Sequence, residues 1–158
     1  MKRAFVLCGG GSLGSYEVGV WKYFREVGMN FDIVTGTSIG AINGAFVAAN
    51  EFDKAVELWK SAAASKVMSN GLNFPRDFLN EFDWKKDRKK LNNFAKSFIS
   101  HGGADISPFM EWVKEAVPVS EVKTSPITLG VVTTSFPVLK ELDVVLNDVK
   151  EENILDYL

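Results

Sequence analysis

Apolar and polar positions along the chain predict an alternation of strands and helices. Four short apolar runs predict strands, over residues 3–8, 31–35, 127–136 and 138–146. Longer segments, in which apolar residues recur every three or four positions, predict helices. These segments are residues 15–27, 38–50, 53–63, 84–99, 107–117 and 151–158.

Local signals predict several helix ends and one buried helix. Gly28 is a typical C-terminal stop, Asp53 is expected to cap a helix, and Ser107-Pro108 combines a cap residue with a proline in the first turn. The segment 38–50 is apolar almost all round, so we expect it to be buried. Residues 64–83 are expected to be irregular.

Strands that alternate with helices are typical of an α/β protein with a mainly parallel sheet. We expect one domain over residues 1–158, with a three-layer α/β/α architecture. The first strand is expected to be buried, and Cys8 at its end to be a small buried residue. A hydrophobic content of 46% and a charged content of 24% suit an ordinary globular domain.

The charge balance argues against nucleic acid as a partner. Eighteen basic residues stand against 20 acidic ones, which gives a formal net charge of −2. Lys85 to Lys90 is a local exception, with five basic residues in six. A solvated helix face is the favoured interpretation of this cluster, and contact with anionic lipid head groups is the alternative.

Cysteine content and the length of the apolar segments indicate the cellular location of the protein. Cys8 is the single cysteine, so an intrachain disulfide and a cysteine-based metal site are excluded. The apolar run near the N-terminus is too short for a signal peptide, and nothing approaches the roughly 20 apolar residues of a membrane span. We expect a cytoplasmic protein, with peripheral membrane contact as an addition.

A glycine-rich segment follows the first predicted strand directly. Gly9-Gly10-Gly11-Ser12-Leu13-Gly14 fits G-x-G-x-x-G and precedes a helix. Glycines permit tight turns and leave backbone N–H groups uncovered, and at a helix N-terminus such groups stabilise an anion. The anion could be a pyrophosphate or the oxyanion of a tetrahedral intermediate.

A second motif lies between the second predicted strand and the buried helix. Gly36-Thr37-Ser38-Ile39-Gly40 fits G-x-S-x-G in the strand–helix setting that a nucleophile elbow requires. Both motifs leave the carboxyl ends of neighbouring parallel strands, where ligand sites of open α/β sheets form. Ser38 is therefore the predicted nucleophile, and the alternative is a small residue tolerated in a tight turn.

A dinucleotide-binding site is the rival interpretation of the glycine segment. Such a site expects an acidic residue at the end of the second strand, where it binds the ribose. Asp32 lies at the beginning of that strand instead, at the opposite edge of the sheet. The oxyanion interpretation is favoured.

Together the two motifs resemble those of the patatin-like phospholipases. The resemblance is detailed over about the first 50 residues, from Gly9 to Val20 and from Gly36 to Ala45, and it is loose beyond them. It implies that Ser38 is the nucleophile between the elbow glycines Gly36 and Gly40. It also implies an oxyanion hole in the glycine loop, formed by Gly9, Gly10, Gly11 and Gly14.

Two features depart from the family pattern. Members usually carry Arg or Lys where this chain has Leu13, and they use a Ser–Asp dyad with the aspartate in D-G-[GA]. This sequence contains no Asp-Gly dipeptide. We therefore expect residues 1–158 to be the N-terminal portion of such a domain, without the segment that bears the catalytic aspartate.

Other candidates for the acid or base are weaker. Asp105, Asp143, Asp148 and Asp156 are expected to be cap or surface residues, and His101 a loop histidine. The aromatic segment from Phe74 to Trp84 is expected to pack over the sheet, with a lipid-facing lid as the alternative.

The resemblance implies an acyl-ester hydrolase for phospholipids, lysophospholipids or related lipid esters. It implies an acyl-enzyme on Ser38, no metal and no organic cofactor. The expected partners are a lipid ester, a membrane surface contacted peripherally, and a complementing C-terminal segment. The alternative is an inactive lipid- or protein-binding module that keeps the elbow and lacks the acid.

Overall fold

The computed structural model describes residues 1–64, 107–135 and 138–158. Several predictions lie outside the described residues. These are the irregular segment after residue 64, the aromatic segment 74–84, the helix 84–99, the basic cluster 85–90, His101 and Asp105.

The chain divides into two compact units. Residues 1–60 and 113–158 form the first unit, and residues 61–112 form the second. The first unit contains the described strands and both sequence motifs.

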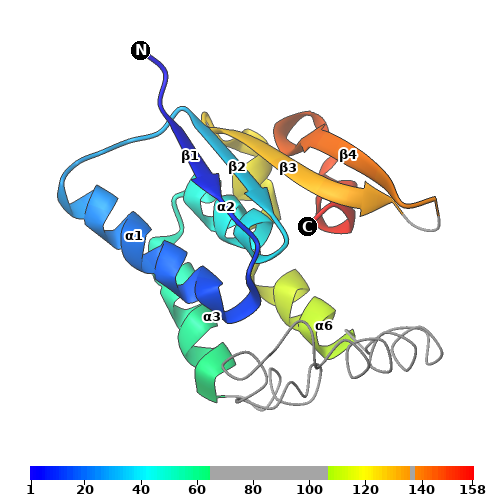
Figure 1. Ribbon diagram of the computed structural model, residues 1–158, viewed down its shortest axis with the longest axis horizontal. Coiled ribbons are helices and arrows are strands. Elements are labelled where there is room, and N and C mark those ends of the chain that lie inside the picture. Colours follow the sequence, from blue (N-terminus) through cyan, green and yellow to red (C-terminus); the bar gives the residue numbers. More distant parts are fainter. Residues whose placement is uncertain (65–106, 136–137) are drawn as a thin grey trace, which may run out of the picture. The chain divides into compact units, whose positions relative to one another are not determined.

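A four-stranded sheet forms the centre of the first unit (Figure 1). Parallel pairing joins β1 to β2 and β2 to β3, and β4 is antiparallel to β3. The structure therefore confirms an α/β fold with a mainly parallel sheet. In order across the sheet, the strands are β1 (Ala4–Leu7), β2 (Ile33–Thr37), β3 (Thr128–Ser135) and β4 (Lys140–Val145).

The described helices agree in kind with most of the predicted ones and differ by a few residues at their ends. The α-helices are α1 (Gly14–Glu26), α2 (Ile39–Ala49), α3 (Phe52–Ala64), α6 (Ser107–Ala116) and α7 (Val119–Thr124). Short 3₁₀ helices are η1 (Gly11–Leu13), η2 (Leu146–Asp148) and η3 (Glu151–Asp156).

Two helix predictions were wrong or missing. Asp53 is not a cap, because α3 begins at Phe52 and Asp53 lies inside its first turn. Helix α7 was not predicted, because its six residues after Pro118 are too few to give a helical period.

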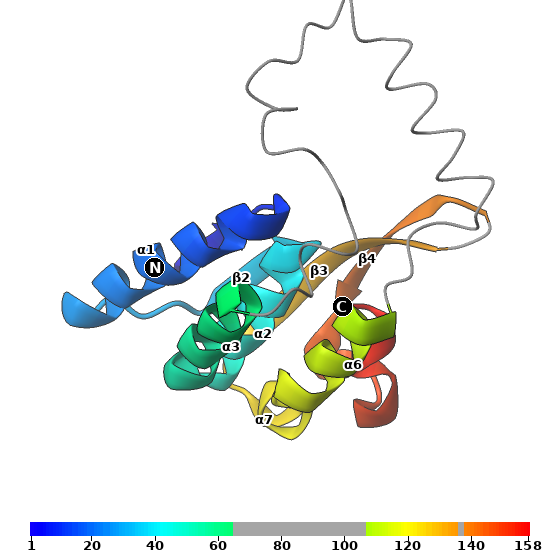
Figure 2. The same cartoon turned by 90° about the horizontal axis from the view of Figure 1, so that it is seen from below.

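Helix α2 is the buried centre of the fold, as its apolar sequence predicted. Ten successive residues from Ile39 to Ala48 are buried. A Cβ atom at Gly44 would lie 3.0 Å from Leu129 Cδ1 and 3.3 Å from Val34 Cγ1, so this glycine lets α2 approach the sheet closely. Figure 2 shows α2 and α7 on the same side of β3 and β4.

Helix α1 packs on that same face of the sheet. The ring of Phe24 meets the edge of Phe5 on β1, with centroids 5.4 Å apart, and Phe31 stacks on Phe5 at 5.0 Å. Edge-to-face and stacked pairs of this kind stabilise a core beyond the area that they bury. The cluster therefore links β1, α1 and the start of β2.

The opposite face of the sheet is partly exposed, and two predictions were wrong there. Val6 on the edge strand β1 is 67% exposed, so β1 is not a buried strand. Cys8 is exposed, because Leu7 takes the last buried position of β1. The part of the unit that the structure describes places no α-helix on this face, so the third layer stays an expectation.

Candidate active site

Ser38 lies at a sharp turn between β2 and α2. Its backbone angles are φ 53° and ψ −130°, a region that residues with a Cβ atom rarely adopt. Holding a serine there costs on the order of 1–3 kcal/mol, which the surrounding structure must offset. The turn leaves Ser38 exposed at the N-terminus of α2, where the helix dipole favours negative charge.

Two glycines allow the turn to be this tight. A Cβ atom at Gly36 would lie 2.3 Å from the carbonyl oxygen of Gly40. At Gly40 it would lie 2.7 Å from the carbonyl oxygens of Leu7 and Cys8. Because these neighbours are backbone atoms and cannot swing away, both positions exclude any side chain.

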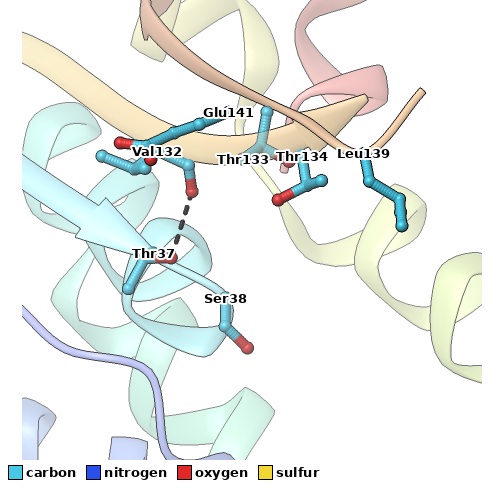
Figure 3. A pocket seen from close by; sticks show the side chains of 7 residues that line it. All are labelled: Thr37, Ser38, Val132, Thr133, Thr134, Leu139 and Glu141. Atoms are coloured by element: carbon cyan, nitrogen blue, oxygen red, sulfur yellow. Dashed lines mark hydrogen bonds between the residues drawn. The ribbon is translucent and has the colours of Figure 1, made fainter. Parts of the chain in front are cut away.

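A hydrogen bond fixes the turn to the next strand. The Thr37 hydroxyl donates to the carbonyl oxygen of Val132 over 3.1 Å, as Figure 3 shows. Thr37 and Val132 are also partners in the parallel register of β2 and β3. The residue before Ser38 is therefore held by both its side chain and its strand.

The glycine loop lies directly against Ser38. A Cβ atom at Gly9 would be 3.2 Å from Ser38 Cβ and 3.8 Å from Ser38 Oγ. The structure thus brings together the two motifs, which are separated by more than 20 residues in sequence. A glycine at position 9 keeps the space beside the serine open.

The loop has a backbone path that favours glycine. Gly10 has φ 153° and Gly11 has φ 55°, and Gly14 at the loop's end is buried where α1 begins. The Leu13 backbone N–H donates to the Gly10 carbonyl over 3.2 Å, which closes the loop. Leu13 itself is 69% exposed, so the surface of the loop is apolar at the position where the resemblance predicts Arg or Lys.

An open pocket of about 560 Å³ adjoins Ser38 (Figure 3). Strands β3 and β4 supply its other wall, and the lining includes hydroxyl, aliphatic and carboxylate groups. The lining residues are Thr37, Ser38, Val132, Thr133, Thr134, Leu139 and Glu141.

The aspartates predicted as alternatives do not line this pocket. Asp143, Asp148 and Asp156 are exposed on β4, η2 and η3, respectively. Glu141 is the carboxylate that lines it, and it was not predicted because aspartates and His101 were the candidates for the acid or base. The register that pairs Glu141 with Thr134 could not be obtained from the spacing of residues. In Figure 3 the Ser38 side chain points away from Glu141.

Comparison with known proteins shows the family. The sequence model of the patatin-like phospholipases matches residues 5–155 of the chain. The chain belongs to the patatin-like phospholipase family. The match includes the glycine loop, the serine turn and the four strands of the sheet.

Curated patatin-like phospholipases are similar to this chain over shorter stretches. Lysophospholipase nte1 of Aspergillus terreus is 56% identical over 43 residues, which are 27% of this chain and 3% of that protein. A patatin-like phospholipase domain-containing protein of Neurospora crassa is 41% identical over 66 residues, 42% of this chain and 8% of that protein. Patatin-like phospholipase domain-containing protein 7 of Rattus norvegicus is 49% identical over 45 residues, which are 28% of this chain and 3% of that protein.

The matched stretches therefore cover less than a tenth of the length of these relatives. No solved structure matches it. Within the described ranges no helix is long and apolar enough to cross a membrane. The same ranges hold no cluster of three or more His, Cys, Asp or Glu side chains that could bind a metal ion.

Proposed function

We propose that this patatin-like phospholipase chain carries the nucleophile and oxyanion hole of a serine acyl-ester hydrolase. Its substrates would be phospholipids, lysophospholipids or related lipid esters. The observation that carries the proposal is the close approach of the glycine loop to Ser38, where any side chain at position 9 would crowd Ser38 Cβ and Oγ. Family membership supports a lipid ester as the substrate class.

In this proposal Ser38 Oγ attacks the ester carbonyl carbon while a carboxylate takes the hydroxyl proton. The C–O bond to the leaving alcohol then breaks, the alcohol takes up a proton, and an acyl-enzyme remains on Ser38. Water then attacks the acyl carbonyl carbon while the carboxylate takes its proton. The bond to Ser38 Oγ breaks, Oγ takes up a proton, and the fatty acid is released. The strained turn helps because it holds Oγ out of the α2 helix and in the open pocket.

Backbone N–H groups of the loop would stabilise the oxyanion. Gly10 and Gly11 are the proposed donors, with Gly9 and Gly14 keeping the loop in its path. One such donor contributes about 3 kcal/mol of transition-state stabilisation. The N-terminal dipole of α2 adds to this field beside Ser38.

The mechanism also requires a base that takes the proton of the Ser38 hydroxyl. Glu141 lies in the pocket of Ser38 but is aimed elsewhere, so we assign the base to a carboxylate outside the described residues. A complementing C-terminal segment, which would bring the family's aspartate, is the proposed source. Contact with a lipid surface would bring the ester to the open pocket.

A second candidate is an inactive lipid- or protein-binding module. It is favoured by one observation, namely that no carboxylate in the described part of the chain forms a hydrogen bond with Ser38 Oγ. A serine without a base would keep the shape of the site and have little nucleophilic reactivity.

A fluorophosphonate probe separates the two candidates. The intact protein is incubated with the probe, and the adduct is located by mass spectrometry of its peptides. We expect one adduct on the peptide with Ser38, its loss in Ser38→Ala, and its retention in Ser135→Ala, which removes an exposed hydroxyl at the end of β3. Absence of the adduct in the unmodified protein would favour the inactive module.

The base is tested by the same probe in Glu141→Gln. If the base lies elsewhere, labelling of Ser38 continues at an unchanged rate. A loss of labelling on the order of a hundredfold or more would identify Glu141 as the base instead. Fatty acid release from lysophospholipid micelles and from phospholipid vesicles then distinguishes the substrate classes.

A further inference from the structure

Asn43 stands apart from the apolar residues around it. It lies on α2 five residues after Ser38 and is 2% exposed. Across the described ranges it is the single buried polar side chain. A buried amide costs stability unless its polar atoms are paired, so its partners indicate what it does.

The Asn43 amide bonds to two other helices. Its Nδ2 donates to the Gly14 carbonyl oxygen over 2.9 Å and to Glu17 Oε2 over 2.8 Å. Its Oδ1 accepts from Trp59 Nε1 over 3.0 Å. Both amide hydrogens are therefore used on α1, and α3 supplies the third partner.

Gly14 is the last residue of the glycine loop, and it is closely packed as well as bonded. A Cβ atom there would lie 2.8 Å from Ile39 Cγ1 and 2.6 Å from Trp59 Cζ2. Ile39 is the residue directly after Ser38. The loop is consequently held at both ends, with Gly9 against Ser38 and Gly14 against the helix that Ser38 begins.

We propose that Asn43 is a positioning residue that fixes the glycine loop relative to Ser38. Apolar packing alone tolerates sliding, whereas a directional bond to the Gly14 carbonyl sets both distance and orientation. The structural part of this proposal stands on the geometry. Its consequence for catalysis rests on the proposed function, because it assumes that the loop binds the oxyanion.

Amide hydrogen exchange tests the structural part. The Leu13 and Gly14 N–H groups bond within the loop, so their exchange reports how well the loop is held. In Asn43→Asp, which removes both amide donors, we expect these amides to exchange about tenfold faster, in keeping with the loss of one buried hydrogen bond. Equal exchange in the variant and the unmodified protein would overturn the proposal.

Asn147→Asp is the matched control. Asn147 is a half-buried amide whose Nδ2 faces the carbonyl oxygens of Val122, Ser125 and Ile127. The control removes the same donors far from the loop, so it should leave Leu13 and Gly14 exchange unchanged. If both variants accelerate loop exchange equally, the effect is general destabilisation and the proposal fails.

A double variant covers the case in which Asn43→Asp does not fold. In Asn43→Asp with Glu17→Gln, the new amide at position 17 can donate to the new carboxylate at position 43, while the Gly14 carbonyl still lacks its donor. We expect a recovered melting temperature together with fast loop exchange. Recovery of slow loop exchange would refute the role of the Gly14 bond.

Fluorophosphonate labelling of Ser38 tests the catalytic consequence. Misplacement of the loop should slow labelling by roughly tenfold to a hundredfold in the double variant and leave Asn147→Asp unchanged. Normal labelling with a loosened loop would overturn the catalytic consequence. If the unmodified protein is not labelled, the proposed function fails, and the exchange experiment still decides whether Asn43 holds the loop.

Discussion

At the scale of single residues, Ser38 occupies a backbone conformation that suits glycine better than serine. A fold keeps such strain where position matters more than stability. Ser38→Gly should therefore be more stable than Ser38→Ala by about 1 kcal/mol, because relief of the strain exceeds the entropy cost of a glycine.

Urea unfolding of the two variants measures this difference. Both lack the hydroxyl, so neither should be labelled by a fluorophosphonate, and stability alone separates them. If Ser38→Gly is no more stable than Ser38→Ala, the turn at position 38 holds no strain.

The residue scale also separates what the sequence could predict from what it could not. The spacing of Gly36, Ser38 and Gly40 after a strand predicted the turn, because each of these positions is set by its immediate neighbours. Asn43 and Glu141 escaped prediction, since their partners lie at least 16 residues away or across a strand register. Only the folded backbone brings those partners together.

At the scale of elements, Arg25 attaches the C-terminal turn of α1 to its neighbours. Its guanidinium lies 5.7 Å from the ring centroid of Trp21 and 5.1 Å from that of Phe52. It also donates to Asn50 Oδ1 over 2.7 Å, at the residue that ends α2. One side chain thus joins the helix after the glycine loop to the helix after Ser38.

Arg25→Ala should lower the free energy of unfolding by about 1–2 kcal/mol, from the loss of cation–π contacts and one hydrogen bond. Lys22→Ala is the control on the same helix, because the exposed Lys22–Glu26 pair at 3.8 Å contributes little. Thermal melts of both variants check the prediction. A Lys22→Ala loss as large as that of Arg25→Ala would show that removal of any long basic side chain from this helix, and not the contacts of Arg25, lowers stability.

Element boundaries agreed with the prediction where apolar residues followed a clear helical pattern, and they differed from it elsewhere. The apolar segment of α2 was predicted within one or two residues. Strand β2 runs two residues later than predicted, since parallel pairing with β3 continues to Thr37. An apolar run alone could not distinguish an edge strand such as β1 from a central one.

At the scale of the whole first unit, the two faces of the sheet differ. Leu7, Val34 and Leu129 face α2 and are buried. The row with Val6, Thr35, Gly130 and Val145 faces the other way. Strand alternation and α/β class were predictable from sequence, whereas the covering of each face depends on which helices the connections bring to it.

This asymmetry leads to a prediction about the exposed face. Val6 and Val145 are 67% and 40% exposed in the described part of the chain. Val6→Thr with Val145→Thr should change the free energy of unfolding by less than about 0.5 kcal/mol and reduce the binding of an apolar dye such as ANS. Val34→Thr, on the buried face, should cost about 1–3 kcal/mol, because it buries a hydroxyl.

Urea unfolding and dye fluorescence of the two variants together decide how the exposed face behaves. If the double variant is as destabilised as Val34→Thr, then residues outside the described ranges or a partner segment cover Val6 and Val145. That result would support a second helical layer over this sheet. If stability is unchanged and dye binding falls, the face is open to solvent, and its valines are free to meet another apolar surface.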